Sequence, residues 1–449
     1  MVSAPGMTKL DVGVHSRVGP TTAISIGFQN ILCLAGLFLF PGLLGASFKL
    51  PPAEIGYLYG ITFMTSGLVV ILQSVLLLRL PIVQGPFAGV FAAVLVTGHQ
   101  RGLGVAFGSL LVACAIWCLL AIPLKRFSAV ALMSRYLRLP VVSGVILLIM
   151  SAQLATIALP NWIGKPGMPG FPSVNLLASA LAAVIVVACM MTRSKVLRRG
   201  AMLWGVAVGA AVYTLLAPTT WERVLHADVF SVPRLFPFGF GVDVFSTVTF
   251  FIVLFPAIAE TVATYEIVAE WSGEPLSQQR VAQGVFGEVF GSLVGALFGG
   301  MATLAYPDNV ALLRVTRVGS RYVTLTTGII LLLLGGFGIF DAALVAIPTP
   351  VLSGATAILF AMLFASGIEV LSRVEWNRAH LLAAGLPFIL AMGAFFTPEA
   401  VQEALPSWAR LLLGQPLVVG AVLSLLIVGV FRLGAMRREE EPRLEPATT

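Results

Sequence analysis

The chain has 449 residues, of which 58% are hydrophobic and only 10% are Asp, Glu, Lys or Arg. Soluble globular proteins carry roughly 25% charged residues, so most of this chain cannot face water. A bilayer core needs about 20 apolar residues per helix, and spans of that length leave no room for a sizeable soluble domain. The surplus of Lys and Arg, 27 against 20 Asp and Glu, is typical of membrane loops, and we expect no nucleic-acid partner.

Apolar runs between polar breaks predict an all-α polytopic membrane protein with about 14 transmembrane segments. The first run continues from Ala23 to Ala46 without a cleavage site, so we expect it to be a span and not a cleaved signal peptide. The predicted spans are 22–46, 54–77, 82–98, 103–122, 139–159, 172–191, 200–217, 244–270, 281–299, 302–317, 322–339, 341–366, 379–396 and 412–434.

The positions of Lys and Arg support this number of spans, because cytoplasmic loops are enriched in both. If both termini are cytoplasmic, most of the 27 fall on that side. The outer side then keeps only Lys49, Arg101, Lys165, Arg223, Arg234 and Arg410. Removing one span would invert every later loop and destroy the segregation. We therefore expect a multi-pass protein of the cell (plasma or inner) membrane with both termini in the cytoplasm.

The longest polar stretch between spans, roughly 218–243, divides the spans into two sets of seven. Because seven is odd, the second set must be an inverted repeat of the first. The third span of each set is short and interrupted by Pro and Gly, in LPIVQGPFAG (80–89) and GGMATLAYPDN (299–309). Such paired breaks are the best indication of a transporter's binding site in a sequence. We expect each to hold a short strand and a half-helix, with Pro86 and Pro307 at the helix starts.

Charged residues inside spans are costly and usually functional. Glu260 lies in the middle of FFIVLFPAIAETVATYEIVAEW, where it either binds substrate or is a neutral acid with an internal hydrogen bond. Thr264 follows one turn later on the same face. Glu288 lies among small residues that permit close helix packing, where it either organises the site or anchors a helix end.

Polar and aromatic residues flank the two breaks. Asp308 is expected both to cap the second half-helix and to bind substrate. Asn309 is expected to bond across to the opposite broken segment. Phe87 and Tyr306 are placed to sandwich a planar ring. These residues predict a binding site for a flat, polar molecule between the breaks.

Metal, enzyme and channel functions are weaker interpretations. Cys114 and Cys118 are one helical turn apart but have no neighbouring His or acidic residue, so we expect no metal and no cofactor. The chain has no H-E-x-x-H, no histidine deep in a span, and GFGVD (239–243) is one residue too long for the G-x-G-D of membrane aspartyl proteases. A channel would not require paired inverted breaks.

Four segments resemble the nucleobase–ascorbate transporter family. YPDNVALLRVTRVGSR (306–321) resembles its signature of Gln or Glu, then Asn, a Gly two residues on and a Thr-Arg pair. AETVAT (259–264) is similar to its eighth helix, where a glutamate binds the substrate. GFQN (27–30) resembles its Gln-His motif, and QGPFAG resembles the break whose Phe stacks on the base. The resemblance covers most of the chain, from residue 20 to residue 434.

The resemblance implies a role for each matching residue. The substrate-binding set would be Glu260, Asp308, Phe87, Tyr306, Asn309 and Thr264. The supporting set would be Gln29, Asn30, Glu288, Thr316 and Arg317. The chain departs from the family pattern in having Asp308 for Gln or Glu, Ala311 for Gly and Asn30 for His, and in having Pro307 where a backbone N–H is available to the substrate.

The expected function is import of a nucleobase, of the uracil or xanthine/purine class, by proton symport with elevator-type alternating access. The resemblance implies a homodimer with core spans at 22–122 and 244–339 and gate spans at 139–217 and 341–434. Cytoplasmic tails at 1–21 and 435–449 would flank them. The alternative is a sulfate- or bicarbonate-like anion carrier of the same fold, which ionised Glu260 and Asp308 disfavour.

Overall fold

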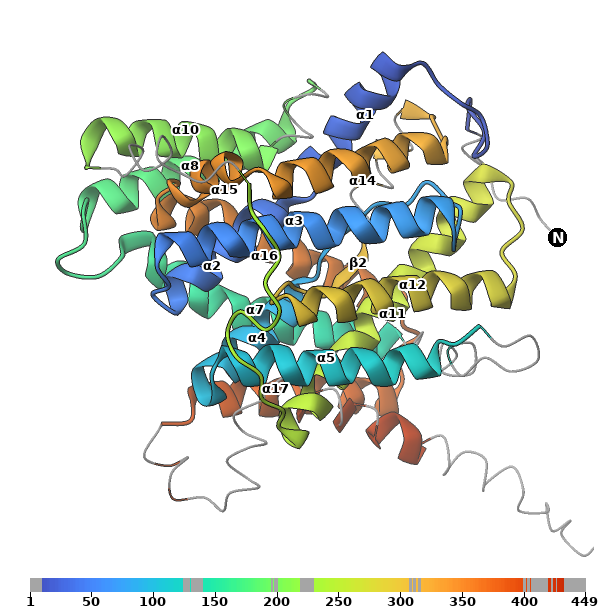
Figure 1. The fold of residues 1–449 in the computed structure, drawn as a ribbon. Helices are drawn as coiled ribbons and strands as arrows, with labels where there is room; N and C mark the ends of the chain where they lie inside the picture. The colour runs from blue at the N-terminus through green and yellow to red at the C-terminus, as the bar shows by residue number, and fades with distance from the viewer. Residues whose placement is uncertain are drawn as a thin grey trace, which may run out of the picture. The chain divides into compact units, whose positions relative to one another are not determined.

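The computed structural model describes residues 10–123, 140–194, 201–218, 230–306 and 316–398, with shorter pieces at 130, 197, 309, 312–313, 401, 404, 419–420, 423–424 and 426–431. Helices dominate these residues (Figure 1). The chain divides into two compact units. The larger is Met1–Tyr136 with Leu154–Met362, and the smaller is Leu137–Gln153 with Leu363–Thr449.

The N-terminal elements of the larger unit are α1 (Pro20–Cys33), α2 (Ala35–Ser47), α3 (Pro52–Val75), β1 (Gln84–Pro86), α4 (Ala88–Arg101) and α5 (Leu103–Leu120). Within the predicted first span (22–46) the helix breaks at Leu34. The Asn30 carbonyl, which would accept the Leu34 N–H in a continuous helix, accepts the Asn309 amide instead. The Leu34 N–H turns to the Ile31 carbonyl at 2.9 Å.

The later elements are α7 (Pro140–Ile163), α8 (Ser173–Met191), α10 (Ala201–Leu216), α11 (Val244–Ser272), α12 (Gln278–Leu297), β2 (Thr303–Ala305), α14 (Arg321–Gly336), α15 (Gly338–Val345), α16 (Thr349–Leu371) and α17 (Arg378–Phe396). Capping explains the ends of α11, because the Asp243 carboxylate accepts the Ser246 N–H at 2.8 Å and Gly273 adopts a positive φ of 65°. The predicted span 341–366 is interrupted between α15 and α16, since Pro348 and Pro350 supply no N–H to continue the helix.

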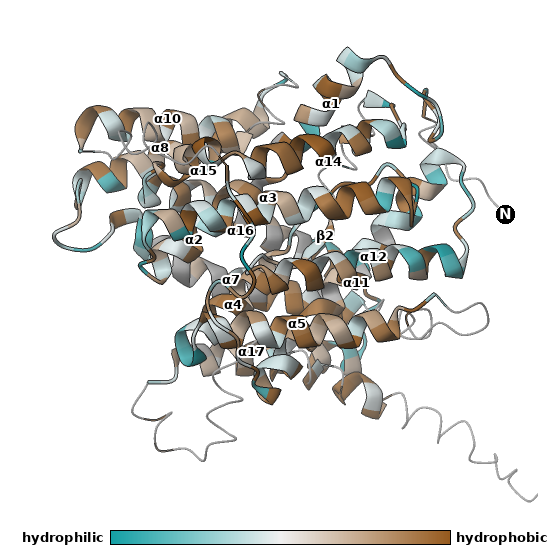
Figure 2. Cartoon of the chain, viewed as in Figure 1, coloured by the Kyte–Doolittle hydropathy of each residue, from teal (hydrophilic) through white to brown (hydrophobic). Residues whose placement is uncertain are grey.

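Hydrophobic residues cover most of each helix, and polar residues gather near the ends (Figure 2). Within the described residues, these stretches are long and apolar enough to cross a bilayer: Pro20–Ser47, Pro52–Val75, Leu103–Leu120, Ser173–Met191, Val244–Ser272 and Thr349–Leu371. Each overlaps a predicted span, although Thr349–Leu371 matches only the later part of 341–366. The described residues of the last predicted span, 412–434, are all helical.

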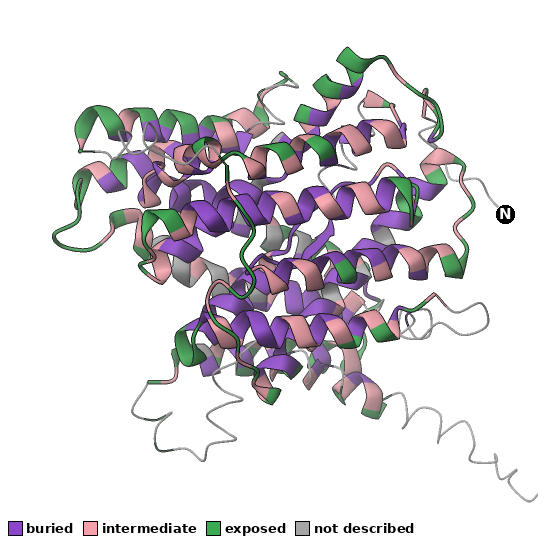
Figure 3. Ribbon diagram, viewed as in Figure 1, coloured by how far each residue is buried: buried purple, intermediate pink, exposed green. Residues whose placement is uncertain are grey.

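Helices α14, α3, α12 and α5 lie side by side in that order (Figure 1). Glycines permit the close contact of α3 with α14. A Cβ on Gly67 would lie 2.7 Å from the Gly328 carbonyl oxygen, and a Cβ on Gly335 would collide with the Gly60 carbonyl. As a result α3 is buried along most of its length (Figure 3). In the smaller unit, a Cβ on Gly144 would similarly lie 3.1 Å from the Gly367 carbonyl oxygen.

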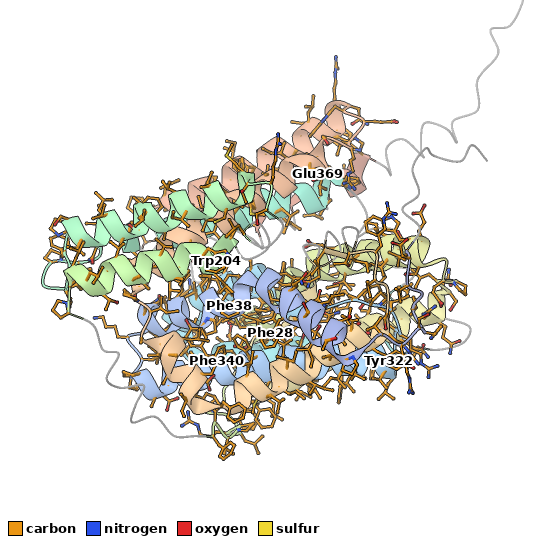
Figure 4. All side chains as sticks on the ribbon, turned by 90° about the horizontal axis from the view of Figure 1, so that it is seen from above. Phe28, Phe38, Trp204, Tyr322, Phe340 and Glu369 are labelled. Atoms are coloured by element: carbon orange, nitrogen blue, oxygen red, sulfur yellow. The ribbon has the colours of Figure 1, made fainter. Side chains whose placement is uncertain are left out.

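Aromatic side chains pack one end of this layer. The Phe63 ring on α3 makes edge contacts with Phe38 on α2 and Phe340 on α15, with centroids 5.4 and 5.3 Å apart (Figure 4). At the start of α14, Arg17 and Arg321 lie 5.5 and 5.3 Å from the centroid of the Tyr322 ring.

A connecting segment, residues 230–243, crosses the ends of these four helices before it enters α11 (Figure 1). Its backbone attaches to α14, α12 and α5 in turn. The hydrogen bonds run from Ser231 N–H to the Gly336 carbonyl (3.0 Å), from Phe236 N–H to the Leu297 carbonyl (3.0 Å), from Gly241 N–H to the Gly104 carbonyl (3.3 Å) and from Asp243 N–H to the Ser109 hydroxyl (3.1 Å).

Arg234 fastens the connecting segment to α3. Its guanidinium donates two hydrogen bonds to the Glu54 carboxylate, at 3.1 and 2.8 Å, and lies 4.3 Å from the centroid of the Tyr57 ring. The bond with Glu54 raises the pKa of Arg234. The Tyr57 hydroxyl accepts the Arg234 N–H at 3.0 Å and donates to the Phe298 carbonyl at 2.8 Å. The segment is therefore fixed to the helices by both backbone and side chains.

Candidate functional site

The two predicted breaks meet as a short antiparallel sheet. The register pairs Gln84 with Ala305, Gly85 with Leu304, and Pro86 with Thr303. Two further backbone bonds extend the ladder, from Phe87 N–H to the Ala302 carbonyl and from Tyr306 N–H to the Val83 carbonyl, both at 3.0 Å. All six strand residues are buried. Extended backbone is tolerated at membrane depth only where protein groups satisfy it, as these bonds do.

A helix follows each strand, as the sequence predicts. Helix α4 starts at Ala88, and the described residues among 309–316 are helical. Pro86 is not at the helix start as expected but ends β1, with Phe87 as the N-cap. Phe87 supplies the ladder hydrogen bond at this end, so the missing proline N–H costs nothing. Pro307 and Asp308 lie outside the described residues, and their roles stay predictions.

Glu288 is a buried junction between β1 and two helices. Its carboxylate accepts hydrogen bonds from the Thr261 hydroxyl at 3.0 Å, the Gln84 amide at 3.2 Å and the Tyr265 hydroxyl at 3.4 Å. The Tyr265 hydroxyl in turn accepts the Gln73 amide at 3.2 Å. The carboxylate thus joins α12 to α11 and β1.

Side chains complete the free edge of β2. The Thr261 hydroxyl accepts the Ala305 N–H at 3.1 Å, and the Ser292 hydroxyl accepts the Thr303 N–H at 3.0 Å. The Ser292 hydroxyl also donates to the Glu288 carbonyl at 2.9 Å. Buried backbone N–H groups without a partner are costly, so α11 and α12 replace the strand that this edge lacks.

Glu260 is half-buried on α11, next to Thr261, and its charge interacts with that of Glu288. Thr264 is buried one turn later, and its hydroxyl donates to the Glu260 carbonyl at 2.9 Å. A hydroxyl that donates inside its own helix keeps its oxygen lone pairs for another partner. The structure therefore brings Glu260 and Thr264 onto a helix that is bonded directly to the strand pair.

The two predicted aromatic residues lie at the strand pair. The Tyr306 hydroxyl donates to the Pro86 carbonyl at 3.1 Å. Its ring covers Gly85, where a Cβ would lie 2.8 Å from the ring edge. Phe87, at the start of α4, is only 2% exposed. The Tyr306 ring is consequently held in place by the opposite strand.

Asn309 bonds to α1 and not to the opposite broken segment as expected. Its amide nitrogen lies 3.0 Å from both the carbonyl and the side-chain oxygen of Asn30. The Asn30 amide donates to the Thr327 hydroxyl at 3.0 Å. The break at Leu34 makes this possible, because it frees the Asn30 carbonyl from its helical bond. The buried Asn309 Oδ1 has no hydrogen-bond partner among the described residues.

The remaining predicted residues make other contacts. Gln29 is half-exposed on α1, and its amide lies 3.4 Å from the Ser25 hydroxyl. The Thr316 hydroxyl donates to the Leu312 carbonyl at 3.0 Å. Arg317 has a φ of 54° and an exposed side chain 3.9 Å from Asp11. These contacts do not place Thr316 and Arg317 at the strand pair.

Sequence reasoning missed Gln73, Gln84, Thr261 and Tyr265, which form the polar network around Glu288. The signal was present, because each is a polar side chain inside a predicted apolar span, and Gln84 belongs to the QGPFAG break. Within the described residues, no group of three His, Cys, Asp or Glu could hold a metal ion.

Two solved structures share the fold. The transmembrane domain of the cyanobacterial bicarbonate transporter BicA matches with a TM-score of 0.54 and 12% identity, covering 93% of this chain and 99% of that one. The murine anion transporter Slc26a9, in the inward-facing state, matches with a TM-score of 0.62 and 13% identity, covering 93% and 70%. This likeness is one of architecture.

Sequence comparison identifies closer relatives. The uric acid permease PucJ of Bacillus subtilis is 26% identical over 424 residues, 91% of this chain and 92% of the relative. The xanthine permease of the same organism is 25% identical over 441 residues, 96% and 98% of the two chains. The xanthine/uracil permease model, described as a permease family, matches residues 21–400. With that match, the chain belongs to the xanthine/uracil permease family of multi-pass membrane transport proteins and is not an enzyme.

Proposed function

We propose that this permease imports a nucleobase of the uracil or xanthine/purine class across the cell membrane. The observation that carries the proposal is Glu260, a half-buried carboxylate on a helix fixed to the strand pair beside Phe87 and Tyr306. Nucleobases present N–H donors beside carbonyl acceptors, and a carboxylate accepts two N–H bonds at once. The names of the relatives, which include uric acid, xanthine and nucleobase transporters, point to the same class of solute.

Proton symport is the proposed energy source. Glu260 and Glu288 interact electrostatically, and two neighbouring carboxylates in a dry site are strained when both are ionised. A proton taken up with the substrate relieves this repulsion and is released when the site reaches the cytoplasm. Asp308, beside the second break, is proposed as the second polar contact to the base.

The proposed mechanism is an elevator. Fourteen spans as an inverted repeat, with cytoplasmic termini, would give core spans at 22–122 and 244–339 that carry the substrate. These would slide against gate spans at 139–217 and 341–434, which hold a homodimer. The support is the paired broken spans together with the shared fold of the two anion carriers.

An anion carrier is the second candidate, favoured by the architecture of BicA and Slc26a9. The charge at the site argues against it. An ionised Glu260 would make the space next to the strand pair negative, and an anion entering it would be repelled. A neutral base with N–H groups gains from the same charge.

The deciding experiment reconstitutes the full chain in liposomes and measures uptake of labelled uracil, xanthine, uric acid, sulfate and bicarbonate. A proton gradient directed inward should drive uptake of a base without sodium, and a protonophore should abolish it. Uptake of sulfate or bicarbonate but of no base would replace the proposal with the anion carrier. Uptake of a base that follows sodium and ignores the proton gradient would retain the substrate class and reject proton coupling.

A further inference from the structure

A second acid lies in the larger unit, away from the strand pair. Asp341 on α15 is 2% exposed; within the described residues its carboxylate oxygens make no hydrogen bond of ordinary geometry, although the Ser231 hydroxyl lies close enough to interact with them. An ionised carboxylate without a partner is far too costly to bury, so such a group is paired, binds a cation or carries a proton. The surroundings of Asp341 distinguish these three states.

Oxygen atoms from three elements crowd the face of α3 at Gly60. A Cβ on Gly60 would lie 2.6 Å from Asp341 Oδ2, 2.8 Å from the Gly335 carbonyl oxygen of α14 and 2.9 Å from the Ser231 hydroxyl of the connecting segment. The three oxygens thus surround one point beside the Cα of Gly60. The Gly335 carbonyl can only accept a hydrogen bond, so it repels an ionised carboxylate and favours a protonated one.

No positive charge compensates Asp341 in the described part of the chain. Arg234 on the connecting segment is committed to Glu54. Helix α2 carries no titratable side chain, and Arg321 and Tyr322 lie at the other end of α14. On α3, Tyr59 is the titratable group that interacts with Asp341, and its hydroxyl donates to the Phe38 carbonyl at 3.1 Å. No cationic side chain pairs with Asp341 among the described residues, which favours a bound proton.

We propose that Asp341 is a proton-binding site, separate from Glu260, that locks the connecting segment to α3 and α14. In this proposal the carboxyl is neutral, and the nearby Gly335 carbonyl is the acceptor for its O–H. Loss of the proton places a negative charge against that carbonyl and against the shielded face of Gly60. Water that enters at Ser231 solvates this negative charge. Its entry separates the start of the connecting segment from the ends of α3 and α14.

The proposal fixes the sign of a pH effect. A carboxyl that is protonated in the folded protein and ionised in the unfolded chain makes the folded state bind more protons. Stability then falls as the pH rises above about 4, where an unfolded aspartate ionises. Asp341→Asn mimics the neutral acid in shape and polarity, so this variant should be folded and should lack that dependence.

Infrared spectra of the purified full-length protein test the protonation directly. The wild type should show the carbonyl stretch of a protonated carboxylic acid that is absent from Asp341→Asn. The same band should remain in Glu369→Gln, which changes an exposed acid of α16 that pairs with Arg373 (Figure 4). A wild-type spectrum identical to that of Asp341→Asn in this region, from about pH 5 to about pH 9, would overturn the proposal.

Hydrogen exchange tests the lock. Amides of residues 230–237 should exchange faster in the wild type than in Asp341→Asn at high pH, and equally at low pH where both side chains are neutral. Comparison at the same pH removes the intrinsic pH dependence of exchange. Equal exchange of the two proteins at high pH, with an infrared band that does titrate, would show that the proton is bound but locks nothing, which contradicts the proposal. Neither measurement needs a transported solute, so failure here is distinct from failure of the nucleobase assignment.

Discussion

The Thr261 hydroxyl accepts the backbone N–H of Ala305 at 3.1 Å, which fixes α11 to β2 one residue after Glu260. Consecutive helical residues have a fixed angular relation, so this bond also fixes the direction of the Glu260 side chain relative to the strand pair. The same hydroxyl donates to Glu288. We therefore expect Thr261 to position the proposed binding carboxylate.

Thr261→Val should weaken both folding and transport. It keeps the shape but leaves the Ala305 N–H without an acceptor and removes a donor to Glu288. A buried group left unsatisfied costs about 1–3 kcal/mol. Thermal denaturation in detergent should show a lower Tm, and uptake should show a raised KM. Thr261→Ser keeps both bonds and should behave as the wild type. If Thr261→Val and Thr261→Ser have the same Tm and the same KM, Thr261 does not position Glu260.

Glu260→Gln should abolish uptake while the purified protein stays folded. The substitution keeps the size of the side chain but removes the charge that accepts two N–H bonds from a base and takes part in proton coupling. Glu266→Gln is the matched control, because Glu266 lies on the same helix with an exposed side chain. For both variants we would measure uptake and the shift in Tm on addition of a base. Normal uptake by Glu260→Gln would remove Glu260 from the site.

Gly85→Ala should disturb the Tyr306 ring. The new Cβ would lie 2.8 Å from the ring and 2.9 Å from the Leu34 side chain, so one of the two must move. We expect a weakened apparent affinity for bases with little change in protein yield. Tyr306→Phe keeps the ring and loses only the hydrogen bond to Pro86, worth about 0.5–1.5 kcal/mol, and should raise KM by about tenfold at most. A larger loss in Tyr306→Phe than in Gly85→Ala would mean that the hydroxyl, and not the ring position, matters.

Asp308→Glu should change the preference between small and large bases. One methylene moves the carboxylate by about 1.5 Å, which is enough to make or break a hydrogen bond. Asp308→Ala should abolish binding. Competition of labelled xanthine uptake by uracil and uric acid measures the preference. Unchanged affinity and selectivity in Asp308→Ala would leave Asp308 as a helix cap only.

Asp243→Ala should destabilise the start of α11 by about 0.5–2 kcal/mol at neutral pH, the usual cost of losing an N-cap. Burial alone would raise the pKa of Asp243, but hydrogen bonds from the Ser246 N–H and hydroxyl, with the charge of Arg101, outweigh it and lower the pKa. Its stabilisation is thus complete above about pH 4 and is lost as the pH falls through the lower folded pKa.

Thermal scans of Asp243→Ala and the wild type should therefore differ at neutral pH and converge in strong acid. Asp243→Asn, which can still cap the helix, should lie between them at neutral pH. A difference between Asp243→Ala and the wild type that does not depend on pH would contradict the assigned role of the ionised carboxylate.

Hydropathy and proline placement were sufficient to predict the positions of most helices and the strand in each broken span. Hydrophobic length and the proline and glycine breaks are local properties, which a sequence records directly. The break at Leu34 was not predictable in this way, because the group that bonds the freed Asn30 carbonyl, the Asn309 amide, lies far along the chain. The split between α15 and α16 was predictable, since Pro348 and Pro350 are visible in the sequence.

For the site, sequence reasoning found the acids but not the groups that hold them. Glu260 and Glu288 were conspicuous as charges in apolar runs. Gln84 and Thr261 were not, because their importance depends on which side chains the fold brings within hydrogen-bond distance. Asn309 was among the predicted site residues. That it bonds to Asn30 on α1 could be recognised only from the fold, which brings these distant segments together.

The ladder between β1 and β2 also constrains how the protein is made. Residues 84–86 leave the ribosome long before residues 303–305, yet their buried backbone bonds are made with those later residues. Until the second strand emerges, the first broken segment cannot reach a satisfied state in the bilayer. The first spans can therefore insert before they are fully folded. A chain truncated before residue 303 retains a membrane-embedded strand segment without its pairing strand. The backbone groups of the first broken segment are satisfied only when the second strand pairs with it.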